Sequence, residues 1–469
     1  MLKSIRYFEE ECINRFEKLE EQFLKHPEQM AEYVLGLTAQ LHQLGLKMIQ
    51  ESLEMMNRML LESPIRRRDW VVEAHIRKQL ITSLGAMAFE KTLFTNNHTG
   101  ESGYLIDRLL GLDKHERMTE DAEALLFQEA VQTSYRRGGE SCSLTAEVSR
   151  QTVKNKIHQL EFPPEKENPC RKKEVEYLYI DADEDHIALQ FRKEKGDLLE
   201  NENHQKNNCL LAKLIYVCEG IEKEAPKSSR HRLVNPHYFC SVNTGKGNEE
   251  FWDEVYEYLD SGYDLKKVKK IYLNSDGGGW IRSGMKRIAG LVHVLDEFHL
   301  ENYLTRLTRR LKDSRWDAAD ELRRIIRQGT KWEFEEASEY ILSNWTAARL
   351  RLRHREGVVG SSTEAHVSHA LSARMSSRPM GWSIRGAEKM ARLRAYYLNG
   401  GDMLELVRYQ GNVLRKAAGA EETYLTTRQI LDSEKSRHRQ VGKYIESISH
   451  SLSLEAKKKS YFNAHIWGL

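Results

Sequence analysis

The chain has 469 residues, and its 72 lysines and arginines nearly balance 70 aspartates and glutamates, giving a formal net charge of +2. Apolar residues make up 40% and charged residues 30%, with only 29 glycines and 8 prolines, which excludes collagen-like, low-complexity and wholly disordered proteins. At roughly 100 to 200 residues per domain, this length predicts two to four domains with a sizeable core.

The sequence gives no sign of a membrane span or of disulfide bonds. No stretch approaches the roughly 18 apolar residues that a span needs, and the first residues (MLKSIRYFEEEC) become acidic before a secretory apolar segment can form. The six cysteines are scattered without a CxxC pair, which indicates neither a disulfide framework nor a cysteine-rich zinc site. We therefore expect a cytoplasmic protein with reduced thiols and no membrane partner.

The first 160 residues predict mainly helical structure. From Ile5 to about Glu62, apolar residues recur every three or four positions, which predicts two amphipathic helices broken near Pro27. Such a stripe forms a core or a dimer seam. Residues 76–105 predict a β-hairpin, because they are rich in threonine and aromatic residues and contain the turn NNHTGESG.

Residues 143–160 (SLTAEVSRQTVKNKIHQL) predict a helix-turn-helix. In this interpretation Ser149 caps the second helix. Arg150, Gln151 and Lys154 would then point outward, where a recognition helix reads groove edges and phosphates. An ordinary surface helix hairpin is the alternative.

A domain boundary is expected at residues 161–175, where three prolines and alternating charges give the composition of a linker. Beyond it we expect three strands, a helix, a strand, a helix and a strand, in YLYIDAD, HIALQFR, LAKLIYVCEG, residues 248–259, KIYLN, residues 283–288 and LVHVLD. Three strands that can pair as a meander, followed by strands alternating with helices, predict an α/β domain with a mixed sheet.

Acidic residues stand where such a sheet would bring them together. They are Asp181 and Asp183 at the end of the first strand, Asp276 after the fourth, and Glu364 at the start of a later helix. Strand ends are where α/β sheets bind ligands, and converging carboxylates repel one another unless cations hold them. The pattern predicts a site for Mg²⁺ or Mn²⁺, and two such ions can promote phosphodiester cleavage. For any one acid alone, a role as a turn former is the alternative.

Four blocks of the sequence resemble one family in the order of that family's motifs. The blocks are YLYIDADEDHIALQ, IYLNSDGGGWI, HVLDEFHLENYL and GSSTEAHVSHALSARMSSRPMGWS. Together they resemble bacterial DDE-type insertion-sequence transposases close to the mutator-like branch, over about the whole chain. The resemblance implies a ribonuclease-H-like core and metal-dependent cleavage and transfer of DNA strands at the ends of a mobile element.

The same resemblance assigns roles to residues. It implies that the catalytic and metal-binding acids are Asp183, Asp276 and Glu364. Asp181 is an alternative first acid, because it has the same strand parity as Asp183. A DxxH-type element matches Asp296 and His299, which implies an auxiliary polar pair near the metals or the DNA.

A basic segment precedes Glu364. Residues 306–327 contain eight basic and four acidic residues, and further arginines follow at 349, 351, 353 and 355. Arginine suits phosphate through its planar fork, and the tryptophans at 316, 332 and 345 offer faces for an unpaired base. We expect DNA contacts from four of these arginines, Arg309, Arg310, Arg323 and Arg324. A solvated helix face is the alternative.

These expectations divide the chain into four regions. Residues 1–165 would form a mainly helical DNA-binding region, 173–300 with 357–400 the ribonuclease-H-like core, 301–356 a basic helical insertion, and 401–469 a helical C-terminal region. The expected partners are double-stranded DNA, at terminal inverted repeats and target sites, and further copies of the chain. When bound to DNA, the protein would associate with the nucleoid. Two alternatives are a non-catalytic or domesticated DNA-binding protein derived from a transposase, and a nuclease that cuts without rejoining.

Overall fold

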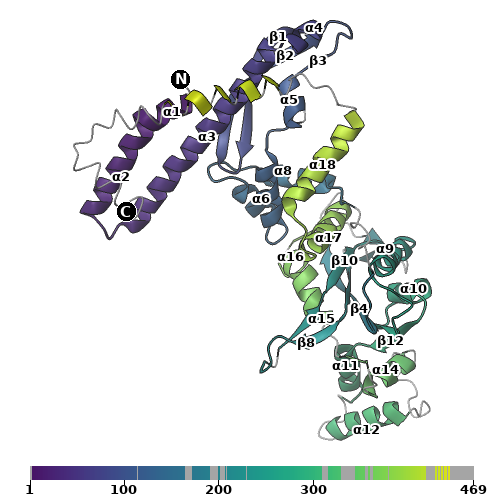
Figure 1. Cartoon of the computed structure of the whole chain (residues 1–469). Coiled ribbons are helices and arrows are strands. Elements are labelled where there is room, and N and C mark those ends of the chain that lie inside the picture. Colours follow the sequence, from purple (N-terminus) through teal and green to yellow (C-terminus); the bar gives the residue numbers. More distant parts are fainter. Residues whose placement is uncertain are drawn as a thin grey trace. The chain divides into compact units, whose positions relative to one another are not determined.

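The computed structural model describes most of the chain: residues 3–112, 115–163, 172–190, 199–200, 206–207, 209–228, 230–308, 315–328, 344–353, 357–359, 363–378, 380–418 and parts of 428–443. At some helical positions, Glu364 among them, only the backbone is described. The chain forms two compact units (Figure 1). The hairpin unit comprises Met1–Leu126, Glu140–Val148 and Val407–Leu469, and the sheet unit comprises Phe127–Gly139 and Ser149–Leu406.

The chain starts with helices separated by a break at Pro27. They are α1 (Lys3–Tyr7), the π-helix η1 (Phe8–Cys12), α2 (Ile13–Lys25), α3 (Met30–Glu62) and α4 (Pro64–Asp69). The predicted pair of amphipathic helices is confirmed, because α2 packs back along α3. Gly36 permits this close approach, since a Cβ atom there would lie 2.5 Å from a methyl carbon of Leu19.

A long β-hairpin follows, made of β1 (Trp70–Thr82) and β2 (Gly85–Asn96), with the short β3 (Ser102–Gly103) paired to β2. The predicted hairpin is confirmed, although it turns at residues 83–84 and the NNHTGESG turn instead joins β2 to β3. Helix α3 packs on β2. The core between them contains Leu53, Leu60, Trp70, Leu80, Met87, Phe89, Phe94, Leu105 and Ile106.

Four helices come next: α5 (Leu105–Leu110), α6 (Glu120–Ala130), α7 (Tyr135–Ser141) and α8 (Arg150–Gln159). The second helix of the predicted helix-turn-helix is confirmed as α8, and the Ser149 hydroxyl accepts the Thr152 amide at 3.2 Å. The predicted first helix is wrong, because residues 143–148 are not helical. There the Leu144 amide donates to the Ser83 carbonyl of the hairpin turn, which replaces a helical hydrogen bond.

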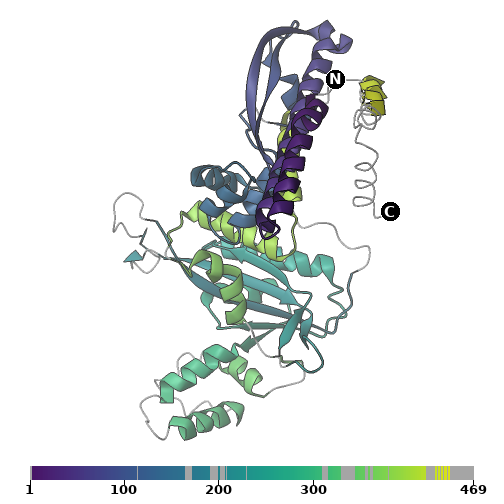
Figure 2. The ribbon, with the colours of Figure 1, turned by 90° about the vertical axis from the view of Figure 1, so that its left-hand side faces the viewer.

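The sheet unit is built on a five-stranded mixed sheet (Figure 2). Its strands are β4 (Tyr177–Ala188), β7 (Cys209–Cys218), β10 (His237–Ser241), β11 (Lys270–Ser275) and β12 (Leu291–Leu295). Their order is β10-β7-β4-β11-β12, with the first three antiparallel and β11 and β12 parallel to β4. Two small ribbons pair β5 (Leu199–Glu200) with β6 (Lys206–Asn207) and β8 (Gly220–Lys223) with β9 (His231–Val234). The predicted mixed sheet is confirmed.

One predicted strand is wrong, and one strand of the sheet was not predicted, while LAKLIYVCEG is confirmed as β7. HIALQFR does not form a strand of its own, because β4 continues through Ala188 and stays paired with β7 along its length. The third strand of the meander is β10, in HYFCS, which follows a hydrophilic stretch. The order of strands and helices that build the main sheet nevertheless matches the prediction.

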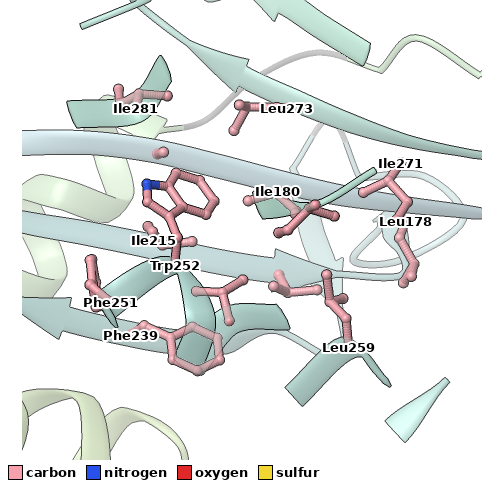
Figure 3. Packing of buried hydrophobic residues seen from close by; sticks show 14 of the residues in the cluster. Leu178, Ile180, Ile215, Phe239, Phe251, Trp252, Leu259, Ile271, Leu273 and Ile281 are labelled. Atoms are coloured by element: carbon pink, nitrogen blue, oxygen red, sulfur yellow. The ribbon is translucent and has the colours of Figure 1, made fainter. Parts of the chain in front are cut away.

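Helices α9 (Gly247–Gly262) and α10 (Gly279–Arg287) supply side chains to a large core on the sheet. Figure 3 shows Trp252 of α9 among the branched residues of the central strands, such as Ile180 and Leu273. The Trp252 indole N–H donates to the Trp280 carbonyl at 3.1 Å. Alternation along β4 and β11 therefore sends apolar side chains to this face and polar ones to the opposite face.

The C-terminal half of the sheet unit is completed by helices. They are α15 (Thr363–Val367), the π-helix η3 (Ser368–Ser372), α16 (Ala373–Met375) and α17 (Ile384–Leu398), and α18 (Met403–Ala418) follows them. Helix α15 packs on β4 and α17 on β10 and α8. The predicted domain limits stay a prediction, although α8 lies with the sheet unit rather than with the hairpin.

The segment between β12 and α15 is mainly helical where the structure describes it. It contains α11 (Glu297–Thr308), α12 (Arg315–Gln328) and α14 (Trp345–Leu352). These helices share a small apolar cluster with the end of β12, formed by Leu295, Leu300, Leu304, Ile326, Ala347, Ala348 and Leu352. In the described parts of the chain, no helix is long and apolar enough to cross a membrane.

Replacement of Gly284 by alanine tests the packing of α10. Its Cβ atom would lie 2.2 Å from the buried Trp252 indole, so Gly284→Ala should lower the free energy of unfolding by about 1–3 kcal/mol. Gly262→Ala is the matched control, because nothing lies within 4 Å of the Cβ atom it would add. Urea denaturation measures both, and equal stability of the two variants would contradict this packing.

Candidate functional site

Two of the predicted acids lie on one face of the sheet, one within β4 and the other directly after β11. The pairing of β4 with β11 places Asp181 opposite Asn274. Two residues further along each strand come Asp183 and Asp276, on the same face as the preceding pair. Because neighbouring strands are about 4.8 Å apart, the register brings these two carboxylates together.

A third aspartate extends this row on the next strand. The pairing of β11 with β12 places Ser275 opposite Leu295. The Asp296 amide then donates to the Ser275 carbonyl at 2.9 Å, which continues the pairing past the strand end. Asp276 and Asp296 therefore follow neighbouring strands at the same level.

Backbone amides orient two of these carboxylates. Asp183, of which only 8% is exposed, accepts the Glu184 amide at 2.8 Å. Asp276 accepts the Gly278 amide at 2.8 Å, which closes a tight turn. Gly277, which lies between Asp276 and Gly278, has a φ of +83°, and a Cβ atom there would lie 2.4 Å from the Asn344 side chain. The SDGGG sequence thus serves both the turn and the approach of the helical segment.

His299 lies beside the acids and responds to their charge. Its Nδ1 atom and its amide both lie 3.1 Å from one oxygen of Asp296. The hydrogen bond with Asp296 raises the pKa of His299, and the charges of Asp296, Asp183 and Asp276 raise it further, while burial acts in the opposite direction. The predicted auxiliary pair and the two strand acids therefore belong to one cluster.

Asp181 is held differently from Asp183. It is 3% exposed, and its two oxygens accept the Tyr216 hydroxyl at 2.5 Å and the Asn274 amide nitrogen at 2.6 Å. The Tyr216 ring in turn lies 4.7 Å from the His366 ring of α15. Asp181 thus joins three strands and a helix through side-chain hydrogen bonds and packing.

Glu364 lies on α15, the helix that packs on β4, but its side chain is outside the described part of the structure. Among the side chains that are described, no group of three or more histidine, cysteine, aspartate or glutamate residues is arranged to hold a metal ion. The two oxygen donors Asp183 and Asp276 suit a hard ion such as Mg²⁺. A complete ligand set needs a third donor, so the predicted metal site stays a prediction.

The residues predicted to bind DNA differ in their surroundings. On α8, Arg150 and Gln151 are exposed and Lys154 is half-buried, and Gln151 donates to Asn155. The buried face of α8, with Val153, belongs to the sheet unit.

In the helical segment, Arg323 is already paired, since it contacts Glu301 at 2.5 Å and Asp320 at 2.6 Å. Arg324 is exposed, as is Trp316 at 64%. The predicted contacts Arg309 and Arg310, and the predicted stacking residue at 332, lie outside the described residues.

The sequence analysis did not predict Asn274 and Arg351 as parts of the site. Asn274 stands two residues before Asp276 and is buried. Arg351 belongs to the alternating arginines before Glu364, yet it is buried and points into the sheet edge, not to solvent. Its place between Leu350 and Leu352 of α14 is the local sign of this burial.

Comparison with known proteins places most of the chain in one group. Residues 24–410 match a family described as Uncharacterised protein family UPF0236. The chain belongs to this family. Its function therefore has to be argued from the site.

Several UPF0236 relatives come from Caldanaerobacter subterraneus subsp. tengcongensis. One is 32% identical over 422 residues, covering 87% of this chain and 85% of the relative, and its name joins eleven gene labels. A second, with four joined labels, has the same identity and the same coverage. A UPF0236 protein of Streptococcus gallolyticus, named for its place in the vanSb 3′ region, is 25% identical over 371 residues, covering 71% of this chain and 75% of the relative.

A comparison of Asp181→Asn with Asp183→Asn tests the different surroundings of the two acids. Asp181→Asn puts an amide against the Asn274 amide donor in the interior, so it should cost about 2–4 kcal/mol of stability. Asp183→Asn removes one charge from a row of like charges and should leave stability unchanged or raise it by about 1 kcal/mol. Denaturation with EDTA present measures both, and equal losses would contradict this distinction.

Proposed function

We propose that this UPF0236 protein is a DDE-type transposase whose ribonuclease-H-like core cuts and transfers DNA strands with the help of divalent metal ions. The observation that carries the proposal is that Asp183 and Asp276 each lie two residues beyond the paired residues Asp181 and Asn274, and that the charges of both act on His299. The sheet order, with an antiparallel meander followed by two parallel strands, also agrees with the core that the sequence resemblance implies.

Asp183 is the better candidate for the first acid. The oxygens of Asp181 both accept hydrogen bonds from side chains that belong to the sheet, so that carboxylate stabilises the fold. Asp183 lies one strand repeat further along, level with Asp276 and near His299. Glu364 would complete the ligand set from α15, which packs on β4.

When bound, Mg²⁺ or Mn²⁺ would activate the attacking oxygen and stabilise the leaving oxygen of a phosphodiester. The acids would hold such ions beside the middle of β4 and the carboxyl end of β11. Asp296 fixes the imidazole of His299 beside them, and a raised pKa keeps that ring ready to carry a proton. A protonated ring offers a positive charge to a phosphate near the acids.

DNA would be held by exposed basic and aromatic groups on either side of the acids. Arg324 and Trp316 of α12 belong to the segment that directly precedes Glu364, and Arg150 lies at the start of α8. The proposed partners are double-stranded DNA and further copies of the chain on that DNA. Relatives whose single name joins many gene labels of one genome agree with a gene that has been copied from place to place.

Removal of single acids tests the proposed chemistry. Asp183→Asn, Asp276→Asn and Glu364→Gln should each lower Mg²⁺-dependent nicking of DNA that carries the ends of the element by more than about 100-fold, because each removes a proposed metal ligand. Asp260→Asn is the control, since that acid lies exposed on α9. Gel analysis of end-labelled DNA measures nicking, and a second assay with target DNA measures strand transfer.

If the Asp276→Asn protein still binds DNA and nicks it at the parental rate, the proposal is contradicted. Nicking without any strand transfer by the parent protein would favour the nuclease alternative. Specific DNA binding with neither reaction would favour the non-catalytic alternative.

A second experiment tests the DNA contacts of α8. Arg150→Ala with Lys154→Ala should weaken binding to the element ends and reduce the slope of log affinity against log salt by about one unit for each phosphate that the protein no longer neutralises. The control pair is Lys267→Ala with Lys269→Ala, which removes the same charge from exposed positions before β11. Fluorescence anisotropy between about 50 and about 300 mM salt measures the slope. If both pairs behave alike, α8 is not a DNA-contacting helix.

A further inference from the structure

Arg351 of α14 reaches from the helical segment into the edge of the sheet. Its guanidinium group makes three hydrogen bonds, and each uses a different nitrogen. Nε donates to the Leu295 carbonyl at 2.8 Å, Nη1 to the Val359 carbonyl at 2.5 Å, and Nη2 to the Asn274 side-chain oxygen at 2.7 Å. With 3% exposed, Arg351 makes these bonds away from water.

All three acceptors lie shortly before acids of the proposed site. They precede these acids by one, five and two residues, and the acids are Asp296, Glu364 and Asp276 respectively. One guanidinium group therefore contacts the end of β12, the connection leading into α15, and the end of β11. These hydrogen bonds hold Arg351 against the segments that carry the acids, and they hold those segments against one another.

The network continues to the strand that carries the first acid. The Asn274 amide nitrogen donates to Asp181 at 2.6 Å while its oxygen accepts from Arg351. The amide thus bridges a buried carboxylate and a buried guanidinium, so that the charges compensate each other. Since Asp183 lies two residues beyond Asp181, Arg351 is linked to every segment that carries a proposed acid.

We propose that Arg351 is a positioning residue, which fixes the middle of β4, the ends of β11 and β12 and the segment that leads into α15 relative to one another. This inference rests on the proposed function only in what the fixed acids are used for. Metal-assisted reactions need ligands held to within about 0.5 Å, and such precision comes from supporting hydrogen bonds. Lysine cannot replace the arginine, because an ammonium group is a point charge without the planar fork that reaches three separate acceptors.

The experiment compares Arg351→Lys with Arg374→Lys. Both arginines are buried and bind backbone carbonyls, and Arg374 holds the Ala130 carbonyl at 2.9 Å while stacking on Trp382. We expect both variants to lose similar stability. Only Arg351→Lys should speed amide hydrogen exchange in residues 296–308 and 363–367, and weaken Mn²⁺ binding to the DNA-free protein by about 10-fold or more, as removal of a supporting hydrogen bond does.

Isothermal titration measures Mn²⁺ binding, and the Mg²⁺ concentration for half-maximal nicking should rise in parallel. Parental Mn²⁺ affinity and parental exchange in those segments would overturn the inference, because Arg351 would then only contribute stability. If Arg351→Lys does not fold, Asn274→Ala removes the link to Asp181 and should give the same pattern more weakly. A parent protein that neither binds Mn²⁺ nor nicks DNA contradicts the proposed function, whereas the exchange comparison still decides the role of Arg351.

Discussion

The parallel pairing of β4 with β11 is the constraint on which the site depends. That register pairs Asp181 with Asn274, and Asp183 and Asp276 each follow two residues beyond this pair on the same face. A shift by one residue would send the acids into the apolar face packed on α9 and α10. The large core around Trp252 therefore does more than stabilise the unit, because it penalises every other register of these two strands.

Like charges that lie close together on a sheet oppose folding, because they repel one another. In this structure the acids are held by fixed hydrogen-bond partners. Asp183 and Asp276 each accept a backbone amide, Asp296 is bonded to His299, and Asp181 is balanced through Asn274. Neighbouring carboxylates would destabilise an ordinary turn or surface loop, but they are what the proposed cation site requires. Repulsion among these acids lowers the free energy of unfolding, as is typical of functional sites.

Much of this could be predicted from the sequence, because the information is local. Alternation in YLYIDAD predicts the face on which Asp183 lies, the SDGGG turn places Asp276 after β11, and apolar periodicity predicts the helices, whereas the predicted strand end after Asp183 is wrong because β4 continues to Ala188. The first helix of the helix-turn-helix could not be excluded from periodicity alone, since a tertiary bond from Leu144 to Ser83 decides it. The burial of Arg351 could not be predicted either, because its acceptor Asn274 lies 77 residues away in the sequence. A run of arginines normally indicates a solvent-exposed or phosphate-binding face.

The small cluster around Leu295 has a consequence for how this fold can change. Helix α12 packs on α11 and α14, whereas α14 also packs on β12, and Leu295 is the buried residue that the central sheet contributes to their shared cluster. Insertions or deletions on either side of α12 should therefore cost the sheet little, because closing a longer loop adds only about 0.6 kcal/mol per doubling. The same architecture would let one sheet carry different outer surfaces, and protein engineers could exchange α12 between members of the family as a module while Arg351 of α14 stays in place.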